Sequence, residues 1–363
     1  MLLCYWCFGY GAWLCLALML AAGIIAHHQK LSALLAVGIL LLPATQYPAT
    51  TWWSKPDLDR EYVLSLDVEH YFGNIQKMRK HLETDRQILW VTYYRNLYNA
   101  THPSEINSPV SLSRNLLAWN QPGTNGLILP VNPSASFLSI LFANELWFTL
   151  GDMTMAEHCA MLSMIFSPRN SGSRMIKRLA EINLVNGDDE AALKYLRILD
   201  KTLLHKSWAE KRIPGQQTLR VKEWLEKKRR DIPTQDQLRS GNDAVTSLQN
   251  LVASNAGNLR AYEYLLCYHL LSKDLRSFVE DYVPGKVSSP IFAEALLIHL
   301  ARQGNIRAEE LIKYQIPVEI AKEFADYTRL YEAKDTSLKE KYGKTYWFYY
   351  HFATTEPGKE SKP

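Results

Sequence analysis

Few residues of this sequence stand at a spacing that could support catalysis or metal binding. Cys4 and Cys7 form a Cys-x-x-Cys pair, a redox-active spacing in thioredoxin-like proteins, but a long uncharged segment surrounds them and offers no strand–helix context. Asp67 with His70, and the Glu-His-Cys run at 157–159, come closest to a ligand cluster. Neither has a further clustered partner, whereas a zinc site needs three or four ligands. We therefore predict no metal site and no cofactor.

Sequence motifs of nucleophilic and phosphate-binding enzymes are also missing. The chain contains no Gly-x-Ser-x-Gly, no phosphate-binding loop, no Gly-x-Gly-x-x-Gly and no His-Glu-x-x-His. Cys159 and Cys267 fall within predicted helices and are interpreted as small core residues. We predict no catalytic residue, so the function is expected to follow from the architecture.

Basic residues gather in one stretch of the chain. Residues 201–230 hold ten Lys or Arg and three Glu, and the stretch ends in Lys227, Lys228, Arg229 and Arg230. Such a run can contact anionic lipid headgroups or nucleic acid, or it can be the solvated face of a helix. We keep these last four residues as a candidate anionic-surface contact. The net charge of the whole chain is only +4, which argues against an obligate nucleic-acid binder.

Charge is spread unevenly along the chain. Lys30 is the only charged residue among the first 54 of 363, whereas the remainder has the charge density of a soluble domain. Residues 2–26 would form about 37 Å of uncharged helix, enough to cross a hydrocarbon core of about 30 Å. A signal peptide is the competing interpretation, but this run is longer than a usual signal-peptide core and no Lys or Arg precedes it.

A second uncharged run follows at residues 31–53. Pro43 and Pro48 interrupt it, and Trp52 and Trp53 close it as an aromatic belt at a membrane surface would. We interpret this run as a second span, with a partly re-entrant or interfacial stretch as the alternative. Residues 1–54 are therefore predicted to form a transmembrane helical hairpin in a lipid bilayer. The few basic residues around it leave open on which side the rest of the chain lies.

Apolar residues recur at helical spacing after residue 54. This pattern predicts an all-α domain over 55–352, followed by a polar tail at 353–363. Three Pro and two Gly mark a loop at 119–133 inside the domain.

Two Gly-Asp turns, at 151–152 and 187–188, carry the clearest signal. Each joins two predicted helices, and a small residue, Ala156 or Ala192, stands five positions after each glycine. The predicted helices of these pairs are 134–150, 153–166, 174–185 and 190–203. Weaker pairs are predicted at 258–271 with 274–282, and at 292–302 with 308–314. The predicted structural turn residues are Gly73, Gly151, Asp152, Gly187, Asp188 and Gly304.

This arrangement resembles a tetratricopeptide repeat, in which a helix pair recurs about every 34 residues; the two glycines are 36 residues apart. One helix pair cannot bury its apolar face, so stacked pairs form a continuous core and leave a concave groove. The resemblance implies a superhelical stack, with an ordinary helical bundle as the alternative.

The chain as a whole resembles a family of uncharacterised bacterial membrane proteins, domain of unknown function 6057. The likeness is carried by the segments 174–181, 187–191, 208–209, 262–265, 270–274 and 346–350. Family members look like several spans followed by helical repeats, which implies an integral protein of the bacterial plasma membrane and no known reaction. This chain departs from the pattern in having only two predicted spans.

These observations together predict a membrane-anchored helical-repeat scaffold. We expect it to hold a protein or peptide partner in its groove and the lipid bilayer through residues 1–54. The alternative is the C-terminal part, or a subunit, of a multi-span membrane enzyme such as a glycosyltransferase or ligase.

Overall fold

The computed structural model describes residues 58–83, 88–101, 126–129, 131, 136–166, 172–235 and 243–353. The hairpin predicted for 1–54, the Cys4–Cys7 pair and the tail from 354 on lie outside these residues, as does most of the predicted loop at 119–133. Every regular element in the described residues is an α-helix, which confirms the predicted all-α class. None of these helices is both long and apolar enough to cross a bilayer.

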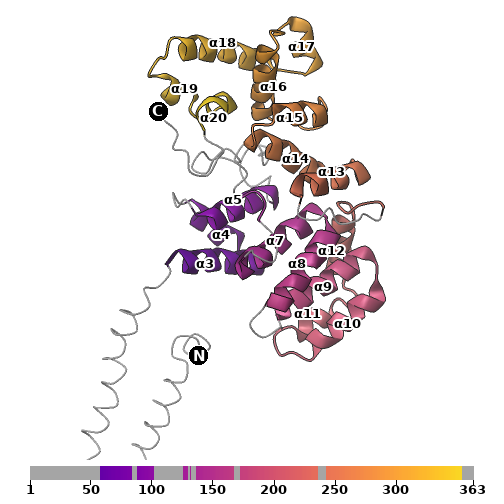
Figure 1. The fold of residues 1–363 in the computed structure, drawn as a ribbon. Coiled ribbons are helices and arrows are strands. Elements are labelled where there is room, and N and C mark those ends of the chain that lie inside the picture. Colours follow the sequence, from indigo (N-terminus) through magenta and orange to yellow (C-terminus); the bar gives the residue numbers. More distant parts are fainter. Residues whose placement is uncertain are drawn as a thin grey trace, which may run out of the picture. The chain divides into compact units, whose positions relative to one another are not determined.

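The described residues form a series of helices along the chain (Figure 1). The first are α3 (Leu58–Phe72), α4 (Ile75–Leu82), α5 (Leu89–Thr101), α7 (Phe137–Leu150), α8 (Met153–Phe166), α9 (Ser173–Asn186) and α10 (Asp189–Asp200). Next come α11 (Lys206–Glu210), α12 (Leu219–Arg229), α13 (Ala244–Ser254), α14 (Leu259–Leu271) and α15 (Leu275–Asp281). The last are α16 (Pro290–Arg302), α17 (Ala308–Lys313), α18 (Val318–Glu332), α19 (Leu338–Tyr342) and α20 (Tyr346–Phe352).

The chain divides into two compact units, residues 1–68 and 69–363, with the boundary inside α3. Helices α7 to α20 and the last turn of α3 belong to the second unit, and they supply all the residues of the candidate site described below.

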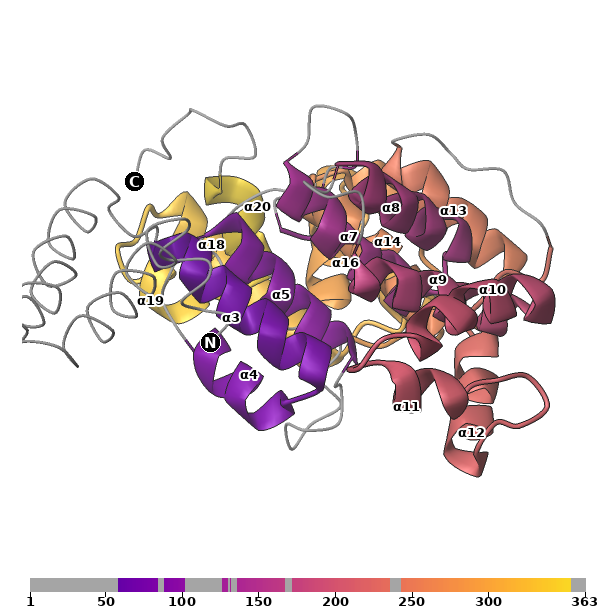
Figure 2. The ribbon, with the colours of Figure 1, turned by 90° about the horizontal axis from the view of Figure 1, so that it is seen from below.

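Helices α7 to α10 form two consecutive pairs in the second unit. Helix α7 packs on α8, α8 on α9, and α9 on α10 (Figure 2). Each pair is joined by a Gly-Asp turn in which the backbone of the glycine has the left-handed conformation, with φ of +94° at Gly151 and +83° at Gly187. The Asp side chain, Asp152 or Asp188, then accepts a hydrogen bond from the backbone N–H three residues on, at 2.8 and 3.0 Å. Such a cap satisfies a donor that the first turn of a helix leaves open.

The turn between α7 and α8 is enclosed by later parts of the chain. A Cβ atom on Gly151 would lie 2.2 Å from the carbonyl oxygen of Asp231, so only glycine fits. Asn258 Nδ2 donates to Leu150 O and to Asp231 O, both at 2.7 Å. Arg260 forms an ion pair with Asp231 at 3.3 Å. These contacts fix the end of α12 and the start of α14 against the first helix pair.

Both predicted later pairs are present as helices. Helix α14 packs on α15 as predicted, whereas the second pair differs from the prediction. Helix α16 makes its main contacts with α15, α18 and α20. Helix α17, predicted as its partner, is six residues long and buries no side chain. A helix this short and polar cannot supply an apolar face, and the longer α18 takes that place.

Helix α20 closes the C-terminal end of the described chain with aromatic side chains. Tyr346 OH donates to Leu270 O at 2.9 Å, and Tyr349 OH donates to Leu271 O at 2.8 Å. The two tyrosines thereby occupy carbonyl groups that the last turn of α14 leaves without an intrahelical partner.

Candidate functional site

A cavity of about 220 Å³ lies where the end of α3 meets α7, α9 and α12. We call it the Lys177 cavity. Three aromatic rings line it, those of Tyr71, Phe148 and Trp224. Its basic lining residues are Arg174, Lys177 and Arg178, and the remaining ones are His70, Glu145 and Glu181.

Helix α9 presents four of these side chains on one face. Arg174, Lys177, Arg178 and Glu181 are spaced three, four and seven residues apart, which brings them to the same side of a helix. Helix α7 supplies Glu145 together with Phe148, again three residues apart. The packing of these helices thus brings three cationic side chains, those of Arg174, Lys177 and Arg178, close to the carboxylates of Glu145 and Glu181. His70 lies beside them.

Glu145 is the buried counter-charge of the cavity, with 7% of its side chain exposed. Its Oε1 accepts from Arg174 at 2.8 Å and its Oε2 from Arg178 at 2.5 Å, while His70 Nε2 lies 3.4 Å from Oε2. Burial raises the pKa of Glu145, but Arg178 and Arg174 outweigh it and hold that pKa well below its usual value. Glu145 therefore stays ionised and fixes both guanidinium groups.

Arg178 is also held by its other contacts. A second guanidinium nitrogen lies 3.1 Å from Glu181, and the group is 3.9 Å from the ring centroid of Phe148. Both arginines of the cavity are thus paired with carboxylates inside the protein.

Lys177 differs from the two arginines. Its ammonium lies over aromatic faces, 4.6 Å from the ring centroid of Tyr71 and 5.0 Å from that of Trp208, and 3.5 Å from Tyr71 OH. In the described part of the chain it forms no ion pair with a carboxylate. Burial lowers the pKa of Lys177, because the desolvated ammonium lacks a counter-charge in contact.

Lys228 adds positive charge next to the cavity, because it packs against the lining residue Phe148. Its ammonium lies 4.6 Å from the ring centroid of Phe148 and donates to Phe148 O at 3.4 Å. Burial, with a smaller contribution from Arg178 and Arg260, lowers the pKa of Lys228 to about 8. The ammonium remains largely protonated at neutral pH.

The chain matches a known protein family over most of its length. The model of a family of unknown function, DUF6057, matches residues 31–353. The chain belongs to the DUF6057 family. The match confirms the resemblance carried by the segments from 174–181 to 346–350, and the first of these segments is the one that lines the cavity. No curated protein and no solved structure shows significant similarity to the chain.

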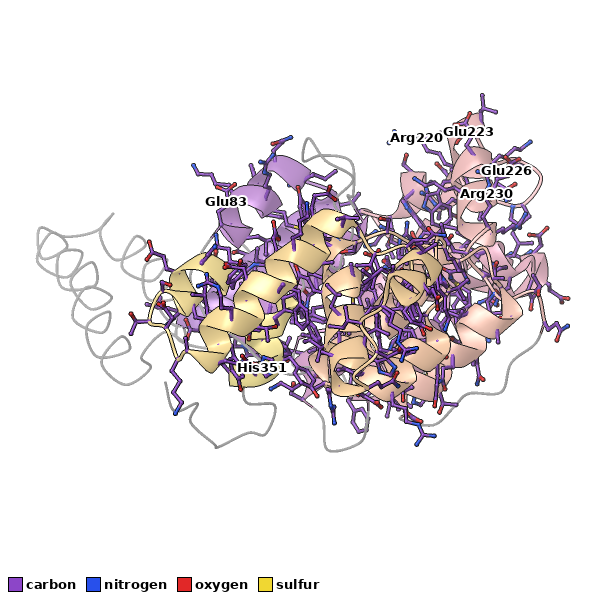
Figure 3. The ribbon with its side chains drawn as sticks, turned by 90° about the horizontal axis from the view of Figure 1, so that it is seen from above. Glu83, Arg220, Glu223, Glu226, Arg230 and His351 are labelled. Atoms are coloured by element: carbon purple, nitrogen blue, oxygen red, sulfur yellow. The ribbon has the colours of Figure 1, made fainter. Side chains whose placement is uncertain are left out.

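In this DUF6057 member, only Lys228 of the last four basic residues is not exposed, and its ammonium faces Phe148. Lys227, Arg229 and Arg230 are exposed. The guanidinium of Arg229 still donates to the carbonyls of residues 184 and 185 at the end of α9, at 2.7 and 3.0 Å. In Figure 3, Arg230 lies with Arg220, Glu223 and Glu226 on the outer side of α12. Contact of the run with an anionic surface stays a prediction, which now rests on its exposed members.

The predicted turn glycines all lie in the left-handed region. Besides Gly151 and Gly187, Gly73 has φ of +69° and Gly304 has φ of +63°. A Cβ atom on Gly73, Gly187 or Gly304 would meet nothing within 4 Å, so these three serve the turn alone.

Most residues of the Lys177 cavity were not predicted as a site. The sequence pattern marks His70 only as part of an incomplete ligand pair with Asp67, and no group of three His, Cys, Asp or Glu in the described ranges is placed to hold a metal ion. The available signal was the Arg-x-x-Lys-Arg-x-x-Glu spacing at 174–181, which predicts one charged helix face. Its buried partner, Glu145, is 33 residues from Arg178 in the sequence, and nothing in the sequence links the two.

Proposed function

We propose that this protein is a membrane-tethered helical-repeat scaffold, and that the Lys177 cavity holds an acidic side chain of a partner protein. The observation that carries the proposal is the ammonium of Lys177. It is half-buried and borders a cavity, and its close contacts are the rings of Tyr71 and Trp208 and the hydroxyl of Tyr71. Glu181 on the same helix face partly offsets the effect of burial but forms no ion pair with it in the described part of the chain. A desolvated charge without an ion-pair partner is costly, and a carboxylate supplied by a ligand would lower that cost.

The size of the cavity favours a side chain over a large substrate. Its volume of about 220 Å³ falls below the roughly 300–1,000 Å³ of pockets that enclose drug-sized ligands. A Glu or Asp side chain fits such a space, and the rings of Tyr71 and Trp224 can pack against its methylene groups.

The scaffold part of the proposal rests on the helix pairs. Two pairs with the same Gly-Asp turn and the same Asp cap recur 36 residues apart, at Gly151 and Gly187, which supports a tetratricopeptide-like stack. The first helices of these two pairs, α7 and α9, supply six of the nine lining residues of the cavity, and α3 and α12 supply the others. The concave surface of a repeat stack is where such proteins usually bind a partner.

The tether is proposed for residues 1–54, whose long uncharged runs suit a transmembrane hairpin in the bacterial plasma membrane. A tethered scaffold would keep its partner at the bilayer without any chemistry of its own.

The test is affinity capture of the full chain from carbonate-washed membranes of its own organism. Wild type is compared with Lys177→Met, which removes the ammonium but keeps a flexible apolar side chain over the rings. We expect wild type to stay in the washed membranes and to retain a stoichiometric protein. Lys177→Met should lose that protein, because a desolvated charge contact contributes about 2–5 kcal/mol, or roughly 30-fold or more in affinity.

Two controls separate binding from folding. Lys322→Met changes an exposed lysine of α18 and should retain the partner. Urea denaturation of Lys177→Met should show unchanged or higher stability, since the desolvated charge is gone. Equal capture by wild type and Lys177→Met would refute the assignment of the cavity, and release of wild type by carbonate would refute the tether.

A further inference from the structure

The connection between α10 and α11 displays two leucines that the cavity does not use. Leu203 is 96% exposed and Leu204 is 84% exposed, and Ile198, near the end of α10, is 44% exposed. Exposed single leucines are common on protein surfaces, but two adjacent and almost fully exposed ones form a small apolar tip.

Hydrogen bonds fix the backbone that carries this tip. Thr202 Oγ1 donates to Leu199 O at 2.7 Å and accepts from the backbone N–H of His205 at 3.2 Å. The backbone N–H of Lys206 donates to Thr202 O at 3.1 Å. His205 Nε2 also lies 3.2 Å from Ser173 Oγ, at the start of α9. The leucines are therefore held outward by an ordered turn.

Exposed basic residues stand on both sides of the two leucines in the sequence. Lys201 and Lys206 are each two positions from the nearer leucine, and Arg197 and Lys211 lie further out, all four exposed. The acidic residues of this stretch are Asp200 and Glu210, and Glu210 lies 4.0 Å from Lys206. Cations thus outnumber carboxylates around the leucines.

We propose that this turn, residues 197–211, docks on the surface of a bilayer with anionic headgroups. Leu203 and Leu204 would enter the boundary between headgroups and acyl chains, while Lys201 and Lys206 would contact the headgroup phosphates. Apolar side chains beside Lys and Arg are the combination that interfacial membrane segments use. Each leucine buried in this way strengthens binding by roughly tenfold or more.

A bilayer suits this tip better than a protein partner does. A stable protein interface covers about 800 Å² on each side, whereas the apolar tip consists of two side chains at the crest of a turn. The contact goes beyond the proposed function, because it uses neither the Lys177 cavity nor residues 1–54.

The test is photo-crosslinking of the full chain reconstituted into vesicles. Leu203 is replaced by p-benzoylphenylalanine, and lipid adducts are measured by mass spectrometry in vesicles with phosphatidylglycerol and in vesicles of phosphatidylcholine alone. We expect lipid adducts at position 203, at several-fold higher yield with phosphatidylglycerol. Adding Lys201→Glu and Lys206→Glu should lower that yield several-fold.

The matched control is Ile312→p-benzoylphenylalanine. Ile312 is an isoleucine of α17 with 77% exposure; Glu309 and Glu310 precede it in the same short helix, and the adjacent Lys313 is paired with Glu310 at 3.2 Å. It should give few lipid adducts. Equal yields at 203 and 312, no lipid adduct at 203, or adducts at 203 to protein alone would each overturn the proposal.

Discussion

Among single residues, the charged side chains of the Lys177 cavity differ in their pairing. Arg174 and Arg178 form ion pairs with Glu145, whereas Lys177 is proposed to bind a partner's carboxylate. Glu145 binds two arginines at 2.8 and 2.5 Å and is thereby committed to the fold. The ammonium of Lys177 is half-buried and lies over aromatic rings, and it forms no ion pair with a carboxylate of the described residues. Cation–π contacts contribute roughly 0.5–2 kcal/mol, less than a well-paired buried carboxylate would. This difference is why the binding role is assigned to Lys177 and a structural role to the arginines.

Asp152 gives a prediction on stability and pH. Burial raises the pKa of Asp152 to about 6, above the roughly 3.9 of an unfolded chain. The stability that its protonated form provides is complete below pH ~4 and is lost as the pH rises through about 6. Asp152→Asn keeps an oxygen that can cap α8 but cannot ionise. We expect the variant to unfold like wild type near pH 4 and to be more stable at pH 7, by up to about 3 kcal/mol.

Urea denaturation across this pH range measures the effect. Asp188 caps α10 by the same hydrogen bond but is exposed, so Asp188→Asn is the matched control. A stability difference between wild type and Asp152→Asn that does not change with pH would show that the carboxyl group is not desolvated.

At the scale of elements, the glycines of the two Gly-Asp turns make different demands. Both are left-handed, so an alanine at either position is strained by about 1 kcal/mol. The Cβ atom of Gly187→Ala would meet nothing within 4 Å, whereas that of Gly151→Ala would lie 2.2 Å from the backbone of Asp231. We therefore expect Gly187→Ala to lose about 1 kcal/mol of unfolding free energy and Gly151→Ala to lose about 3 kcal/mol or more.

Chemical denaturation of the two alanine variants checks this prediction. The comparison tests the junction of α7, α8, α12 and α14, since the extra loss at Gly151 comes only from the enclosed turn. Similar losses at both positions would contradict that packing.

Local signals explain how much of the fold was predictable. Gly151 and Gly187 stop one helix and Asp152 and Asp188 start the next, so the sequence predicted the ends of α7 to α10 within a few residues. Helices α11 and α12 carry many charges and few periodic apolar residues, and the segment between 204 and 257 was not assigned to pairs. The pairing of α16 with α18 and α20 depends on tertiary contacts that no local pattern encodes.

The site was less predictable than the fold for a related reason. The spacing of Arg174, Lys177 and Arg178 is local and visible, but their meaning depends on Glu145 and Tyr71, which other helices bring to them. The charge count of the basic run at 201–230 predicts an anionic-surface contact. Two of its last four residues nevertheless contact the protein itself, Lys228 at Phe148 and Arg229 at the end of α9.

In the whole molecule, three parts of one chain have separate proposed roles. Residues 1–54 are proposed to hold it in the bilayer, the cavity between α3, α7, α9 and α12 to bind the partner, and the turn at 197–211 to touch the lipid surface. Each part can fail without the others, because the tests above use different positions and different readouts. The cavity is the central claim, since it alone assigns the protein a partner.

Photo-crosslinking from inside the cavity tests that claim most directly. Tyr71, an aromatic lining residue, is replaced by p-benzoylphenylalanine in the full chain, and crosslinks are formed in the membranes of its own organism. We expect one dominant protein adduct, attached through a peptide with Asp or Glu at the crosslink and lost when Lys177→Met is added. The same probe at Tyr331, an exposed tyrosine of α18, should not give that adduct. No protein adduct at position 71, or one that Lys177→Met leaves unchanged, would contradict the account.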